Sequence, residues 1–161
     1  MKVFVITLTL LITVAVLITP VLADDEADVR AEMLRFLTAL NTGDVDGFME
    51  HYPPRNTSFV PENTFLSRYE SLDDQRKSWK ATVDSGQKLD LKLRHLEIEI
   101  YNHSAAVVTC YVTGTATLPD GTIREVNWKR SGVMIKQEGQ WKEVHHHRSP
   151  LRLRFAQIKA V

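Results

Sequence analysis

The sequence predicts an α+β domain in which three N-terminal helices pack on a strongly bent antiparallel sheet. Helical periodicity dominates the chain up to Gly86, and an apolar-polar alternation with a period of two takes over from Leu89. Within this alternating segment the apolar residues change parity at Arg94-His95, which is typical of a β-bulge and bends a strand. The order of these patterns places the helices on one face of a curved sheet.

The first helix is expected over Asp24 to Asn41, because apolar residues recur there at helical spacing and the first turn is acidic. Gly43 ends this helix, and Asp44 caps a short second helix that Pro53-Pro54 ends. A short strand is expected at Thr57 to Val60.

The third helix is expected over about Ser71 to Ser85. Ser71 and Asp74 form a capping box at its start, and Gly86 follows its end. Four long strands joined by short turns complete the chain. They are expected at Leu89 to Ile100, Ala105 to Leu118, Ile123 to Lys136 and Trp141 to Ser149.

Residues 1–23 have the pattern of a secretory signal peptide. Lys2 precedes an apolar run from Val3 to Ile18, Pro20 breaks that run, and Val21-Leu22-Ala23 offers small residues at a cleavage site. We expect cleavage after Ala23, a secreted or periplasmic protein, and no stable membrane anchor after cleavage. The alternative is an uncleaved anchor, because Val3 to Leu22 is just long enough to span a bilayer.

Length and composition indicate one folded domain over residues 24–149, with a C-terminal tail at 150–161. The 161 residues contain 20 basic and 20 acidic side chains, so no bulk charge indicates nucleic acid as a partner. A single cysteine excludes an internal disulfide and a cysteine-rich zinc module. Cys110 lies in an apolar strand and is expected to be a buried, inert thiol.

The element order and one short block resemble the nuclear transport factor 2-like superfamily, in its SnoaL-like branch. The helix that starts at Gly43-Asp44-Val45-Asp46 and the bent meander fit this pattern. The block from Gly139 to Ser149, G-Q-W-K-E-V-H-H-H-R-S, is similar to the last strand of the association (hub) domain of calcium/calmodulin-dependent protein kinase type II. There the pattern is G-K-W-x-I-V-H-x-H-R-S, so Glu143 replaces an apolar residue.

The resemblance implies a cone-shaped fold that dimerises or forms a larger homo-oligomer through its sheet. It also implies a central pocket that contains the arginine before the last serine, which is Arg148 here. A second pocket arginine of the hub falls at Gly132 in this chain, and Arg130 lies two residues earlier with the same strand parity. The hub-like pattern requires no metal and no cofactor.

The triple histidine is the most conspicuous cluster of the chain. On a regular strand, His145 and His147 point to one side together with Glu143, while Val144, His146 and Arg148 point to the other. His145 and His147 are expected at a subunit interface. Glu143, His145 and His147 are residue types that bind metals, but no fourth ligand is evident, and we expect no metal here.

Two arginines in strands that line a cavity favour a small anionic ligand, because a guanidinium holds a carboxylate or phosphate in a bidentate fork. The candidate ligand-binding residues are Arg148, Arg130, His146, Tyr52, Trp79 and Tyr111. The alternative for the arginines is an ion pair with Glu125 or Glu143, and for the aromatic residues it is ordinary core packing.

We therefore expect an exported SnoaL-like domain that binds a small, anionic molecule and self-associates. The first alternative is an isomerase-, cyclase- or hydrolase-like enzyme, for which His146 is the remaining acid–base candidate. The second alternative is a purely structural oligomerisation module.

Overall fold

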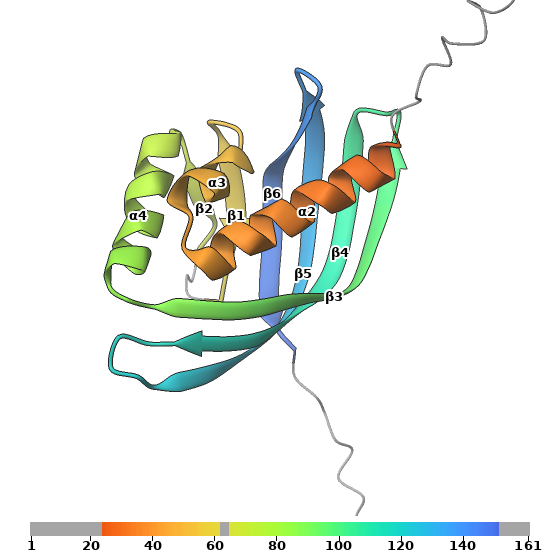
Figure 1. Ribbon diagram of the computed structural model, residues 1–161. Helices are drawn as coiled ribbons and strands as arrows, with labels where there is room; N and C mark the ends of the chain where they lie inside the picture. The colour runs from red at the N-terminus through yellow and green to blue at the C-terminus, as the bar shows by residue number, and fades with distance from the viewer. Residues whose placement is uncertain (1–23, 62–64, 152–161) are drawn as a thin grey trace, which may run out of the picture.

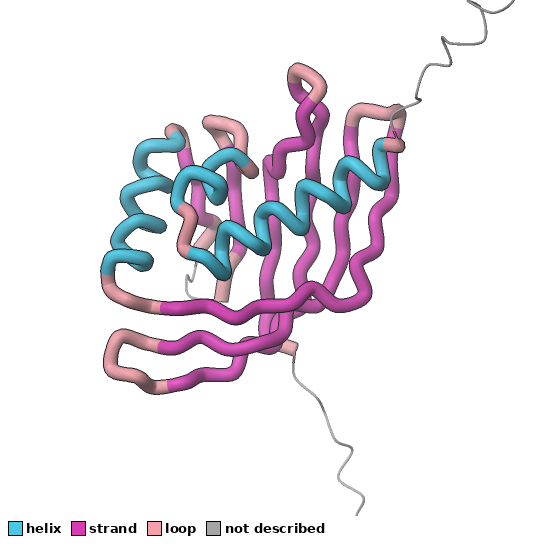
Figure 2. The backbone as a smooth tube through the Cα atoms, in the orientation of Figure 1, coloured by secondary structure: helices cyan, strands magenta, loops and turns pink. Residues whose placement is uncertain are grey.

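The computed structural model describes residues 24–61 and 65–151. The predicted signal peptide and residues 152–161 of the predicted tail lie outside these ranges. Three helices cover one face of a curved sheet, as the ribbon in Figure 1 and the tube in Figure 2 show. The helices are α2 (Asp25–Thr42), α3 (Val45–Glu50) and α4 (Leu72–Asp84). None of the described helices is long and apolar enough to cross a membrane.

The predicted caps form the helix ends. The Asp24 carboxylate accepts hydrogen bonds from the backbone N–H groups of Glu26 and Ala27 at the start of α2. Gly43 ends the helix in the left-handed region, with φ of 69°. Asp44 caps α3 and Ser71 caps α4, each through its side-chain oxygen. All three predicted helices are confirmed to within about two residues.

Four long strands form the predicted meander: β3 (Lys88–Tyr101), β4 (Ala105–Thr117), β5 (Ile123–Gln137) and β6 (Gln140–Pro150). The register of β3 against β4 shifts between Arg94 and Glu97, and His95 has a positive φ of 51°. This is the bulge that the parity change predicted. In Figure 1, β3 starts below α4, runs beneath α2 and then turns upward, so the sheet wraps around the helices.

The sheet contains a parallel pairing that the sequence did not reveal. Its order is β2-β1-β6-β5-β4-β3, with β1 at Asn56–Phe59 and β2 at Ser67–Tyr69. β1 lies parallel to β6, with Thr57 opposite His145 and Phe59 opposite His147. The sheet is therefore mixed and six-stranded, and all its other pairings are antiparallel.

The inner face of the sheet, which faces the helices, carries the core. Even-numbered residues of β4 and β5 point inward, and odd-numbered ones point outward to the opposite, outer face. Cys110 is buried on the inner face, as predicted, and burial raises the pKa of its thiol. One core cluster packs α2 against the strands through Val29, Met33, Ala106, Val108, Met134 and Trp141.

Candidate functional site

A second bulge, in β6, determines which side chains of this strand point to the inner face of the sheet. Met134 pairs with Glu143, whereas the preceding residue, Val133, pairs with His145, so Val144 is the extra residue. Glu143 is therefore on the inner face together with His146 and Arg148. The prediction that Glu143 shares a face with His145 and His147 is wrong, because it assumed a regular strand. Among the described residues no group of three histidine, cysteine, aspartate or glutamate side chains is arranged so that it could hold a metal ion.

Glu143 and Arg130 form a fully buried ion pair on this inner face. Arg130 Nη2 donates to both carboxylate oxygens of Glu143 at 2.6 Å, and the two side chains are 3% and 0% exposed. Burial alone raises the pKa of Glu143, but the Arg130 guanidinium, with His146 and His51, holds it well below its usual range. Arg130 Nη1 is also buried and has no hydrogen-bond partner among the described residues.

His51 extends this ion pair towards helix α2. Its Nδ1 lies 2.9 Å from Glu32 Oε1, and its Nε2 lies 3.5 Å from Glu143 Oε2. The ring stacks on Phe36, with 4.2 Å between the ring centroids. Burial would raise the pKa of Glu32, but the contacts with His51 and Arg35 lower it. A chain of four buried charged or polar groups thus runs from α2 to β5.

His146 lies at the other side of the Glu143 carboxylate. Its Nδ1 is 3.2 Å from Glu143 Oε2, and the residue is 8% exposed. Burial lowers the pKa of His146 more than the adjacent carboxylate raises it, so the imidazole is neutral at pH 7. The Tyr52 ring lies 6.1 Å away and is buried, and this burial raises the pKa of the phenol.

Arg148 lies directly opposite Arg130 in the β5–β6 ladder. Its guanidinium carbon is 4.5 Å from the centroid of the Trp128 ring, which is a cation–π contact. The structure therefore brings together four of the predicted ligand-binding residues: Arg148, Arg130, His146 and Tyr52. Trp128 contributes the aromatic ring that Arg148 contacts.

Two predicted aromatic residues have other surroundings. Trp79, on α4, stacks on Phe48 of α3 with 4.7 Å between ring centroids. Tyr111 points to the outer face, where it is 39% exposed and contacts His95 edge-on. It therefore lies away from the inner-face residues. The outward-facing residues of β4 include four threonines and its inward-facing residues are all apolar, so the alternation of this strand already indicates that Tyr111 points outward.

His145 and His147 also lie on the outer face, on the opposite side of β6 from His146. His145 Nδ1 is 2.8 Å from the Thr57 hydroxyl of β1. Both imidazoles contact the Phe59 ring nearly edge-on, with centroids 6.0 Å apart in each case.

The sequence reasoning missed Glu32 and His51. Glu32 follows Val29 by three residues and precedes Phe36 by four, so it lies within the apolar stripe of α2. A carboxylate in such a stripe is a signal that could have identified it. His51 is at the end of a six-residue helix, where no local pattern indicates burial.

Gly132 provides the space that the buried carboxylate occupies. A Cβ atom on this residue would lie 2.2 Å from Glu143 Oε1 and 3.3 Å from Arg130 Nη1. Gly132→Ala will therefore lower the free energy of unfolding by about 1–3 kcal/mol, as overpacking in a core does. Urea denaturation measures this, and Ser131→Ala on the exposed outer face is the control. Equal stability of the two variants would contradict the prediction.

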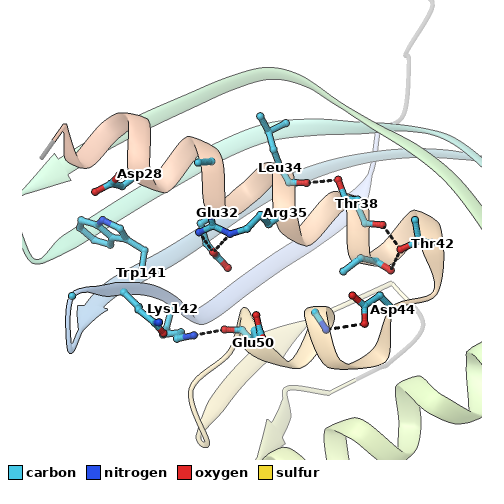
Figure 3. A pocket seen from close by; sticks show the side chains of 15 residues that line it. Asp28, Glu32, Leu34, Arg35, Thr38, Thr42, Asp44, Glu50, Trp141 and Lys142 are labelled. Carbon is cyan, nitrogen blue, oxygen red and sulfur yellow. Dashed lines mark hydrogen bonds and ion pairs between the residues drawn. The ribbon is translucent and has the colours of Figure 1, made fainter.

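A separate groove of about 850 Å³ lies between α2, α3 and the β5–β6 turn. Figure 3 shows Glu32 and Arg35 paired on its α2 side, and Lys142 beside Glu50 on the other. Glu32 belongs both to this groove and to the buried chain, because its Oε1 faces His51 and its Oε2 faces Arg35. The chain of polar contacts therefore joins the groove to the inner face.

Comparisons with known proteins agree with this architecture. A family model described as a SnoaL-like domain matches residues 29–152. A search of curated proteins finds no match.

Three solved structures with this fold are described as different kinds of protein. A ketosteroid isomerase-like protein from Erwinia carotovora atroseptica has a TM-score of 0.69 and 16% identity, covering 81% of this chain and 98% of that one. A nuclear transport factor 2-like protein from Salmonella enterica has a TM-score of 0.68 and 19% identity, covering 85% and 97%. A hub homology domain of calcium/calmodulin-dependent protein kinase II from Chlamydomonas reinhardtii has a TM-score of 0.64 and 24% identity, covering 79% and 98%.

Proposed function

The chain belongs to the SnoaL-like domain family, and we propose that it binds a small anionic ligand on the inner face of its sheet and self-associates through the outer face. One observation carries the ligand proposal. Two guanidinium groups, Arg130 and Arg148, lie opposite each other across β5 and β6, and one carboxylate, Glu143, lies beside them.

The electrostatics of the inner face support an anion. His146 is neutral at pH 7, as are the buried Tyr52 and Cys110, because burial shifts each pKa away from the charged form. Arg130 and Arg148 lie opposite each other in the β5–β6 ladder, and Glu143 pairs with Arg130. Arg130 Nη1 is a buried donor with no acceptor among the described residues, and a ligand oxygen would satisfy it.

A thermal-shift titration tests the ligand proposal. Acetate, formate and benzoate should raise the melting temperature of the protein in a saturable way, because a ligand that binds only the folded state stabilises it. Sodium chloride at equal ionic strength is the control. If none of the carboxylates exceeds the effect of chloride, the protein is not a receptor for small carboxylates.

The outer face supports self-association. Phe59, with His145 and His147 against its ring, is 45% exposed on this face, and Val133 is 37% exposed two strands away. Exposed aromatic and aliphatic side chains on a sheet face fit a second copy of the same surface. The similarity to hub domains supports an oligomer as well.

Light scattering of the domain at micromolar concentration should therefore give more than the mass of one chain. Phe59→Asp should shift the protein to the monomer, because it places a charge in the interface. Leu34→Asp is the matched control, since Leu34 is 50% exposed on α2 and away from the outer face. A monomeric wild-type protein would exclude this interface and the interface role of His145 and His147.

A second candidate function is enzymatic, and the contact of His146 with Glu143 favours it. A neutral imidazole held by a buried carboxylate is a competent general base at pH 7. Turnover of a small substrate that His146→Gln abolishes would support an enzyme, whereas stabilisation by carboxylates without turnover would support a binding domain.

Export is part of the proposal and rests on the sequence of residues 1–23. N-terminal sequencing of the secreted or periplasmic protein should begin at Asp24. A protein that retains Met1 in the membrane fraction would favour the anchor instead.

A further inference from the structure

The groove between α2, α3 and the β5–β6 turn has an excess of negative charge. Four carboxylates and two basic groups line it: Asp28, Glu32, Asp44 and Glu50 against Arg35 and Lys142. Arg35 pairs with Glu32, and the Lys142 ammonium donates to the backbone carbonyl of Glu50. The side chains of Asp28 and Glu50 are exposed and form no hydrogen bond or ion pair among the described residues. Two negative charges therefore remain uncompensated in this groove.

The same groove offers an apolar contact and an unused hydrogen-bond donor. Leu34 lines it and is 50% exposed. Trp141 also lines it, is 4% exposed, and has an indole N–H without an acceptor among the described residues. Figure 3 shows the Trp141 ring between Asp28 and Lys142. A basic peptide suits these features together, because it combines positive charge and apolar side chains with carbonyl oxygens.

Residues 152–161 of this chain have the composition of such a peptide. Their sequence, R-L-R-F-A-Q-I-K-A-V, contains three basic side chains and no acidic one, and apolar residues lie between the basic ones. The charge of this segment is therefore complementary to that of the groove.

The arginines of this segment cannot reach the groove of their own chain. Arg152 and Arg154 lie within three residues of Leu151, and three residues span at most about 10 Å. Leu151 follows the end of β6, nine residues from Lys142, and nine residues of a strand span about 30 Å. In Figure 1 the β5–β6 turn lies at the top and β6 ends at the bottom. Only the segment of another copy can place these arginines in the groove.

We propose that residues 152–161 of one copy bind in the groove of a second copy, with Arg152 and Arg154 beside the carboxylates of Asp28 and Glu50. This contact is heterologous, because the segment of each copy meets the groove of the next. The groove is therefore a peptide site that is incomplete without a partner copy. The contact is separate from the outer-face interface, so each of the two can fail alone.

A synthetic peptide tests the site directly. A fluorescein-labelled peptide of residues 151–161 should bind the protein saturably in an anisotropy titration, and added sodium chloride should weaken the binding. The groove variant, Asp28→Lys with Glu50→Lys, should weaken it by about tenfold or more, because like charges then meet. Glu97→Lys with Glu125→Lys is the matched control, since both carboxylates are exposed on the outer face, and its peptide affinity should equal that of the wild-type protein.

Charge reversal on both partners tests whether the contact joins two copies. The tail variant, Arg152→Glu with Arg154→Glu, and the groove variant should each lose the contact. In an equimolar mixture of the two, every tail meets a groove of opposite charge, so association should return. Both variants are made in a Phe59→Asp background, which removes the outer-face interface, and light scattering at low ionic strength gives the mass.

The Phe59→Asp protein with an unchanged tail and groove is the reference for this experiment. It should exceed the mass of one chain at low ionic strength and become a monomer at about 0.5 M salt, because salt screens exposed charges.

The outcomes decide for or against the proposal. Peptide binding that the groove variant loses, together with association restored only in the mixture, supports it. The proposal is overturned if the peptide does not bind saturably, if the groove variant binds it as well as the wild-type protein does, or if the mixture stays monomeric. A scrambled peptide of the same composition that binds equally well also overturns it, because the groove would then accept any basic peptide. None of these results bears on anion binding at the inner face.

Discussion

Replacing Arg130 by methionine will lower the free energy of unfolding by about 3–5 kcal/mol, because it leaves the Glu143 carboxylate buried without its counter-charge. Glu143 has no solvent exposure, so water cannot replace the lost guanidinium. Chemical denaturation of the wild-type protein and Arg130→Met measures the difference.

The double variant Arg130→Met, Glu143→Leu separates the pair from the individual residues. Because it removes both charges, it should recover a large part of the lost stability, and the two changes should therefore be strongly non-additive. Lys80→Met is the control: it breaks the exposed Lys80–Asp84 pair on α4 and should cost less than about 1 kcal/mol. A loss at Arg130 no larger than this control would contradict the buried pair.

Replacing Arg148 by alanine will weaken carboxylate binding by about 2–5 kcal/mol, as expected for one partner of a desolvated charged pair. Arg148→Lys should recover only part of this, because the ammonium group lacks the planar fork and stacks less well on Trp128. Isothermal titration of acetate or benzoate into each variant measures the affinities.

Lys129→Ala is the matched control for Arg148, because it removes a positive charge from the exposed outer face of the adjacent strand. Its carboxylate affinity should equal that of the wild-type protein. If Arg148→Ala also binds carboxylates normally, the anion site is not at Arg148, and a purely structural oligomerisation module becomes the better account.

Much of the fold could be predicted because its signals are local. The caps at Asp24, Asp44 and Ser71 and the parity change at Arg94-His95 each act within a few residues, and each is confirmed. The pairing of β1 with β6 depends on residues far apart in the chain. No local pattern of a four-residue strand indicates its partner.

The candidate site was predictable in part for the same reason. Arg130, Arg148 and His146 share a face because strand alternation places them there. The position of Glu143 depends on one extra residue at Val144, and such a bulge leaves no clear trace in a block of polar residues. His51 lies beside Glu143 because of contacts between distant parts of the chain, including a hydrogen bond from the Glu143 backbone N–H to the His51 carbonyl, and no local sequence pattern indicates them.

The parallel pairing of β1 with β6 also bears on the order in which the protein folds. The hairpins β3–β4, β4–β5 and β5–β6 close over short turns, whereas Thr57 and His145 are 88 residues apart. Because closing a long loop costs more chain entropy than closing a short one, the meander can form before β1 pairs with β6. Pulse-labelling hydrogen exchange during refolding should therefore find the amides of β4 and β5 protected before those of β1 and β2.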